Sequence, residues 1–204
     1  LQMAKQMLEL EPGSIQAQTM LLQAYIAGDR PDDVYQTLIT LLEQSSSDAD
    51  AVVRHIGEAL GGQRDPSRWV GVMERLSEYL PDKPEVHLAL SFVAQRAGLS
   101  GRADAALDRA LELRSSWEEA ALYRLAWWNE AGKQTAIVDF AKEFLRVNPD
   151  HGYFRLAFAR LLAQWGDNQA ALGQFSTLLV REPDNTAALF AAGLLHLQEE
   201  HYQV

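Results

Sequence analysis

Five histidines are the side chains in this sequence best suited to bind a metal ion or to move a proton. They are scattered along the chain as His55, His87, His151, His196 and His201. The last two flank a pair of glutamates, but a separation of five residues does not place two ligands on one face of a helix. The H-E-x-x-H pattern of zinc enzymes is also absent. We interpret the histidines as core or solvated side chains and predict no metal site.

The other patterns that carry chemistry are missing as well. The sequence has no cysteine, which removes thiol catalysis, disulfides and cysteine-ligated metal centres. It has no glycine-rich phosphate loop and no G-x-S-x-G nucleophile turn. The acidic pairs Asp32-Asp33 and Glu118-Glu119 fall in expected first turns of helices, where the helix dipole favours negative charge. We predict a protein that is not an enzyme, without catalytic residues or a cofactor.

Composition limits the partners. Hydrophobic residues make up 48% of the chain and charged residues 23%, which is typical of a folded globular protein. The 28 acidic and 18 basic residues give a net charge of −10, which disfavours nucleic acids and anionic lipid surfaces. No apolar run approaches the roughly 18 residues of a membrane span, so we expect no direct membrane insertion by this segment. Because the first residues read as the middle of a helix, we expect a segment of a longer protein.

The positions of small residues and prolines repeat along the chain. Gly98, Gly132 and Gly166 are 34 residues apart. Pro81, Ser115, Pro149 and Pro183 follow the same spacing, as do Pro12 and Ser46. Such a period indicates a repeat protein built from one supersecondary unit.

Two sets of small and apolar residues recur in phase with these anchors. Before each anchor, spacings of four and three place three residues on one face of a helix. This second-helix frame is Val34, Leu38, Leu41; Trp69, Met73, Leu76; Ala103, Leu107, Ala110; Ile137, Ala141, Phe144; and Ala171, Phe175, Leu178, with Ala4 and Met7 as a truncated first copy. After each anchor comes a first-helix frame: Gln18, Leu21, Leu22, Tyr25; His87, Leu90, Ser91, Ala94; Leu122, Leu125, Ala126, Asn129; Arg155, Phe158, Ala159, Leu162; and Leu189, Ala192, Gly193, His196. The stretch from Ala51 to Leu60 fits this frame poorly, and Gly61-Gly62-Gln63-Arg64-Asp65-Pro66 makes an unusually long break after it.

These residues resemble the tetratricopeptide repeat, whose signature is W-x2-L-G-x2-Y in the first helix and A-x3-F…P in the second. The best copy holds Phe158, Ala159, Gly166, Ala171 and Phe175, although no copy has the first-helix tryptophan. The resemblance implies an all-α, right-handed α-solenoid of helix–turn–helix repeats that occupies residues 1–204 as a single segment. We expect a partial repeat at 1–13, helix pairs at about 14–47, 48–82, 83–115, 116–149 and 150–183, and a lone first helix at 184–204. Without polar capping helices, both ends should expose apolar residues (Met3, Met7, Phe190 and Leu194) and favour self-association.

In this repeat family the first helices line a concave groove that commonly binds peptides or partner helices. The candidate partner-binding residues on that face are Phe92, Tyr123, Trp127, Glu130, Tyr153, Arg160 and Phe190, accompanied by Gln95, Leu156 and Leu194. Aromatic and arginine side chains are enriched at binding hot spots. The alternative is that they pack between adjacent first helices. Co-chaperones of this family grip acidic tails with Lys, Arg and Asn, but the corresponding residues here are Thr19, Gln23, Val53, Leu88 and Phe92, so we do not expect that clamp.

The amino-acid sequence between the anchors is similar to that of a proteobacterial family of outer-membrane tetratricopeptide lipoproteins. It includes Tyr79-Leu-Pro-Asp-Lys-Pro-Glu-Val-His-Leu-Ala-Leu90, Arg155-Leu-Ala-Phe-Ala-Arg-Leu-Leu162 and Gly193-Leu-Leu-His-Leu-Gln198. A member of that family binds a periplasmic carboxyl-terminal processing protease and presents cell-wall hydrolases to it. The resemblance implies a protein-binding adaptor in the periplasm, anchored to the outer membrane by a lipid outside this chain; otherwise we expect a cytoplasmic scaffold. The alternative function is a structural assembly protein that stacks through its repeat ends.

Overall fold

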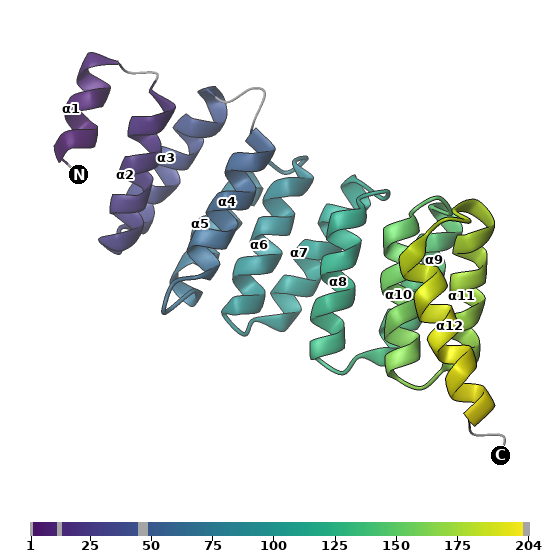
Figure 1. Cartoon of the computed structure of the whole chain (residues 1–204). Helices are drawn as coiled ribbons and strands as arrows, with labels where there is room; N and C mark the ends of the chain where they lie inside the picture. The colour runs from purple at the N-terminus through teal and green to yellow at the C-terminus, as the bar shows by residue number, and fades with distance from the viewer. Residues whose placement is uncertain (1, 12–13, 45–48, 202–204) are drawn as a thin grey trace. The chain divides into compact units, whose positions relative to one another are not determined.

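The structure, a computed structural model, describes residues 2–11, 14–44 and 49–201, and within these ranges it contains helices and no strands. The helices run in the order α1 (Gln2–Leu10), α2 (Ile15–Ala27), α3 (Pro31–Gln44), α4 (Ala49–Gly61), α5 (Ser67–Tyr79), α6 (Pro84–Arg96), α7 (Ser100–Leu113), α8 (Glu118–Glu130), α9 (Gln134–Val147), α10 (Gly152–Gln164), α11 (Asn168–Arg181) and α12 (Thr186–His201) (Figure 1). The chain divides into two compact units, unit 1 (Leu1–Arg114) and unit 2 (Ser115–Val204). The division falls between two helix pairs.

Each unit is a stack of antiparallel helix pairs whose cores follow the second-helix frame. All fifteen frame residues of α3, α5, α7, α9 and α11 are buried, and the most exposed of them, Phe144, keeps only 6% of its surface. In unit 1, α6 packs against α4, α5 and α7; in unit 2, α10 packs against α8, α11 and α12. The spacing of four and three therefore predicted this part of the core correctly, because it places all three residues on the side of each helix that faces its neighbours.

The glycine anchors mark the turns between the two helices of a pair. Gly98, Gly132 and Gly166 have φ angles of 74°, 69° and 85°, in the left-handed region that only glycine adopts without strain. Beside the first of them, the amide of Leu99 donates to the carbonyl of Ala94 at 2.8 Å and so closes the helix end. This conformation explains the 34-residue recurrence of glycine.

Buried polar side chains occupy the first-helix position at which the family signature has tryptophan. The His87 Nε2 lies 2.9 Å from the carbonyl oxygen of Pro81. Two repeats later, Arg155 Nη2 donates to the carbonyl oxygen of Pro149 at 3.2 Å, and its Nη1 donates to Gln174 Oε1 at 2.8 Å. Burial lowers the pKa of the Arg155 guanidinium from its ordinary value. Each side chain thus ties its own helix to the anchor turn that precedes it.

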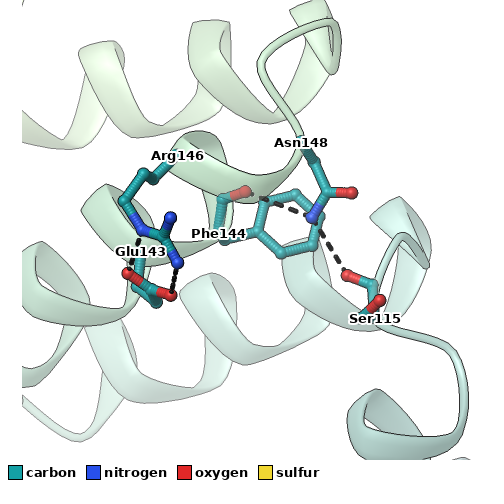
Figure 2. A network of polar contacts seen from close by, with 5 residues as sticks. All are labelled: Ser115, Glu143, Phe144, Arg146 and Asn148. Carbon is teal, nitrogen blue, oxygen red and sulfur yellow. Dashed lines mark hydrogen bonds and ion pairs between the residues drawn. The ribbon is translucent and has the colours of Figure 1, made fainter.

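A third anchor turn is held by an asparagine in the next connection. Asn148 Nδ2 donates to the carbonyl oxygens of Ser115, at 3.0 Å, and Phe144, at 3.1 Å (Figure 2). On the same helix end, Arg146 donates to both carboxylate oxygens of Glu143, at 2.8 Å and 2.6 Å. This bidentate pair lowers the pKa of the Glu143 carboxyl, chiefly through the hydrogen bond from Arg146.

We therefore expect the carboxyl group of Glu143 to titrate below its ordinary pKa in an NMR pH titration. Any stability that this pair contributes is present at neutral pH and is lost as the pH falls through the lowered pKa. Replacing Arg146 with Gln should return the titration midpoint of Glu143 to its ordinary value, and added salt should shrink the shift because both side chains are exposed. An identical midpoint in the two proteins would contradict the role of the pair.

The first-helix frame was wrong by one residue in α8. The expected stripe of Leu122, Leu125, Ala126 and Asn129 includes an exposed residue, Ala126, whereas Ala121, Arg124 and Leu125 are buried. The guanidinium carbon of Arg124 lies 5.0 Å from the ring centroid of Trp128 and 4.9 Å from that of Phe140. Arg124 therefore lies on the buried face of α8, which the pattern of apolar residues did not predict for a charged side chain. It is accommodated there because its aliphatic stem and its guanidinium pack on aromatic rings.

Apolar side chains are exposed on α1 and α12, as the repeat pattern predicted. Met3, Phe190 and Leu194 are exposed, and Met7 is half-buried. Leu10 of α1 and Leu189 and Leu197 of α12 add to these surfaces. In the preceding repeat, the positions that correspond to Leu189 and Phe190 are Arg155 and Leu156, which are buried.

Candidate protein-binding surface

The structure separates the seven candidate residues into three groups. Glu130, Tyr153, Arg160 and Phe190 are exposed, Phe92 and Tyr123 are half-buried, and Trp127 is buried. Phe92 belongs to unit 1 and the other six to unit 2. The exposed residues of unit 2 are therefore the ones available to a partner protein.

Trp127 is a core residue, which corrects the expectation that it lines the groove. Only 6% of its surface is exposed. Its ring stacks on Tyr123 with centroids 6.4 Å apart, and Lys133 Nζ lies 5.5 Å from its centroid. The packing alternative holds for this residue because α8 buries a wide face that takes in the positions around Ala120, Arg124 and Trp127.

Phe92 also takes part in packing. Its ring lies so close to Gly61 of α4 that a Cβ added there would stand 2.6 Å from the Phe92 Cε1 atom. Glycine at residue 61 therefore allows α4 and the Phe92 ring to approach each other. Phe92 contributes a half-exposed edge to the surface of unit 1 rather than a free aromatic side chain.

An open cavity of about 510 Å³ lies where α8, α10 and α12 begin. Its lining includes the apolar side chains of Tyr153, Leu156 and Ala187. Helical spacings of three, four and seven place Arg160 on the same face of α10, and Phe190 and Leu194 on the same face of α12. We call these six residues the α10–α12 surface: Tyr153, Leu156, Arg160, Ala187, Phe190 and Leu194.

Backbone contacts fix the start of α10 and hence the position of Tyr153. Glu118 Oε1 of the preceding pair accepts a hydrogen bond from the backbone amide of Phe154 at 2.9 Å. The same oxygen lies 3.6 Å from His151 Nδ1. A carboxylate at a helix N-terminus satisfies an amide that has no partner within the helix and complements the helix dipole. Tyr153 consequently projects from a well-anchored first turn.

The end of the surface near the cavity is acidic. Asp150 forms an ion pair with Arg181, and Glu182 Oε2 accepts a hydrogen bond from Asn185 Nδ2 at 2.7 Å. Glu182 also stands directly over Gly152, where an added Cβ would clash with its Oε1 atom. Asp184 lines the cavity too, which leaves an excess of carboxylates beside the apolar residues. Such a surface fits a partner with apolar and basic side chains.

The sequence pattern named Tyr153, Arg160 and Phe190 as candidates, and their side chains are exposed, but it did not indicate the acidic residues at the cavity. Glu118, Asp150, Glu182 and Asp184 come from three successive repeats, and no single spacing rule joins all four. The repeat spacing could nonetheless have indicated two of them, because Asp150 and Asp184 are 34 residues apart. They occupy equivalent turns and so lie beside the starts of successive first helices.

Within the described ranges, the structure contains no group of three or more His, Asp or Glu side chains arranged to hold a metal ion. None of the helices in that part of the chain combines the length and the apolar character that a membrane crossing requires.

Comparisons with solved structures identify the fold. The chain is similar to PilW, a widely conserved type IV pilus biogenesis factor, with a TM-score of 0.55 and 17% identity over 92% of this chain and 87% of that one. It is similar to TTC0263, a thermophilic TPR protein of Thermus thermophilus, with a TM-score of 0.54 and 17% identity over 90% of this chain and 100% of that one. It is also similar to the MamA protein, with a TM-score of 0.52 and 12% identity over 83% of this chain and 92% of that one. No protein-family model and no curated protein matches the sequence.

At these identities the likeness establishes the fold, which is the all-α solenoid of tetratricopeptide-repeat proteins. The repeat spacing predicted this fold class correctly.

Proposed function

We propose that this chain is a protein-binding scaffold without enzymatic activity and that it binds a partner through the α10–α12 surface. One observation carries the proposal: Tyr153 and Phe190 are 77% and 70% exposed although they are large and apolar. Folded proteins expose clusters of such side chains mainly at interaction sites, because their removal from water is a strong driving force for association. Arg160 adds a guanidinium to the same face, and it has no ion-pair or hydrogen-bond partner among the described residues.

We further propose that the scaffold serves as a periplasmic adaptor for a carboxyl-terminal processing protease and its cell-wall hydrolase substrates. This proposal is supported by the similarity of the sequence between the repeat anchors to that of outer-membrane lipoproteins with this role. An adaptor of this kind works by raising the local concentration of substrate near a bound protease. It would itself supply no catalytic group.

The test is an affinity capture from a proteobacterial envelope extract with three baits, read out by quantitative mass spectrometry. The baits are the unchanged chain, the double variant Tyr153→Ala/Arg160→Ala, and the control Tyr79→Ala, which removes an exposed tyrosine from α5. We expect the control to retain the partner and the double variant to lose at least about 90% of it, since two hot-spot side chains together contribute about 2–4 kcal/mol. Equal capture by all three baits would overturn the surface assignment. Capture of partners other than a protease or its substrates would overturn the adaptor role.

Self-assembly through the repeat ends is the second candidate function. It is supported by the exposed apolar residues of α1 and α12, such as Met3, Leu10 and Leu197. Apolar stacking persists or strengthens in high salt, whereas binding of a basic partner to an acidic surface weakens. Sedimentation at low and high salt therefore distinguishes the two candidates.

A further inference from the structure

The long connection between α4 and α5 carries an arginine that the fold does not use. The residues from Gly62 to Pro66 join the two helices, and Arg64 in their middle is exposed. Figure 1 shows the connection after α4 at the same edge of unit 1 as the turn after α6. The last residue of α6 is a second exposed arginine, Arg96.

These two arginines line one open pocket of about 350 Å³. The remaining lining residues are Gly61, Gln63, Pro66 and Gln95. Two guanidinium groups and two side-chain amides supply many hydrogen-bond donors, and no carboxylate lines the pocket. The local charge is thus opposite to the net charge of −10 of the whole chain.

The arginines of the pocket differ from the other described arginines of unit 1 in having no partner among the described residues. Each remaining arginine of unit 1 whose side chain the structure describes is paired with a carboxylate: Arg30 with Asp33, Arg68 with Asp29, Arg75 with Asp32, Arg102 with Glu74, Arg109 with Asp82, and Arg114 with Glu85. Neither Arg64 nor Arg96 forms a hydrogen bond or an ion pair with any described residue. In a chain with an excess of acidic side chains, two adjacent unpaired arginines leave their donors available to an external acceptor.

Asp65 and two carbonyl groups at the helix ends, which could have accepted from these donors, already have partners. Asp65 is paired with Arg68 at 3.4 Å. At the end of α4, the Ala59 carbonyl accepts from Gln63 Nε2 at 2.9 Å, and at the end of α6 the carbonyl of Gln95 accepts from the amide of Gly98 at 3.0 Å. The helix ends are therefore capped without either arginine.

Packing also directs Arg96 toward the pocket. A Cβ at Gly61 would stand 3.3 Å from the Arg96 Cγ atom, so the glycine lets the stem of Arg96 lie against the end of α4. Holding the stem reduces the rotamer entropy that the side chain would lose on binding a ligand. One of the two guanidinium groups is thereby partly preorganised.

We infer that the pocket formed by Arg64, Arg96, Gln63 and Gln95 binds an oxyanion, a carboxylate or a phosphate group. Planar guanidinium groups donate in pairs to such acceptors, and their charge-assisted hydrogen bonds are stronger than neutral ones. The site differs from the clamp with which co-chaperones of this fold grip acidic tails, because its arginines come from the α4–α5 connection and the last turn of α6. It lies in unit 1 and does not depend on the α10–α12 surface.

The test is an NMR titration of the arginine Nε–Hε signals of the full chain. Inorganic phosphate and acetate are the two probes, and chloride at matched ionic strength is the control for non-specific screening. We expect the signals of Arg64 and Arg96 to shift saturably, with a dissociation constant of about 1–10 mM for a single small anion. Saturation by phosphate alone or by acetate alone would support the site and name the group that it prefers.

Matched variants complete the test. Arg64→Gln and Arg96→Gln should each weaken binding about tenfold, with unchanged melting, because each removes a charge-assisted contact from an exposed side chain. Arg160→Gln removes an unpaired arginine outside the pocket and should leave binding unchanged. Linear shifts that match those of chloride, or equal responses in the Arg160→Gln protein and the pocket variants, would overturn the oxyanion site. Neither result would affect the test of the α10–α12 surface.

Discussion

Replacing Ala171 with Asp is expected to destabilise unit 2 strongly and to unfold at least the repeat that contains Ala171. Ala171 opens the best copy of the second-helix frame and has no exposed surface. An aspartate there would bury a carboxylate without a cation or donor to compensate it, at a cost of about 3–5 kcal/mol. That cost is a large share of the total stability of a domain, which is about 5–15 kcal/mol. Loss of helical circular dichroism and a red shift of tryptophan fluorescence would measure the effect.

The chain offers a selective optical signal and a matched control for this experiment. Of its five tryptophans, only Trp69 lies in unit 1, so the fluorescence reports mainly on unit 2. Ser176→Asp places the same charge on the exposed side of the same helix and should change the free energy of unfolding by no more than about 0.5 kcal/mol. Unchanged folding of the Ala171→Asp protein would contradict the register of the repeat.

The fold could be predicted from the sequence because its information is periodic. A position such as Leu107 is recognisable as core from its equivalents Met73, Ala141 and Phe175, even though the side chains differ in size. The same averaging failed in α8, where Arg124 is buried by local contacts with Trp128 and Phe140, whereas the equivalent residues of the neighbouring repeats are Leu90 and Phe158. Comparison of the repeats therefore predicts the core positions that they share, but it does not predict contacts that occur in a single repeat.

The candidate sites were harder to predict because they depend on side chains that break the pattern. Tyr153 and Trp127 are both aromatic residues of first helices, but one is exposed and the other buried. Residue type alone does not distinguish them, because their difference in burial depends on which neighbouring helix covers each position. The oxyanion pocket depends on Arg64, which lies in the long connection between α4 and α5. The sequence shows that this connection is unusually long but does not indicate its function. Only the structure showed that Arg64 lies beside Arg96.

An aromatic cluster in unit 2 shows the same limit and gives the second large expected effect. Phe154 is fully buried, with its ring centroid 4.4 Å from that of Phe144 and 6.1 Å from that of Phe140. Phe140 in turn contacts Trp128 edge to face at 5.9 Å. Of these residues only Phe144 belongs to the second-helix frame. The cluster joins α8, α9 and α10, so it holds two successive repeats together.

Replacing Phe154 with Ala should lower the free energy of unfolding of unit 2 by about 3–5 kcal/mol, because it removes the ring and leaves a cavity. Urea unfolding followed by tryptophan fluorescence would measure the change. The neighbouring substitution Tyr153→Ala provides the control, since its side chain is exposed and should alter stability by no more than about 0.5 kcal/mol. The pair separates the two roles within one helical turn: Phe154→Ala should destabilise the unit, and Tyr153→Ala should weaken partner binding at unchanged stability. Equal destabilisation by both would place Tyr153 in the core and remove it from the proposed binding surface.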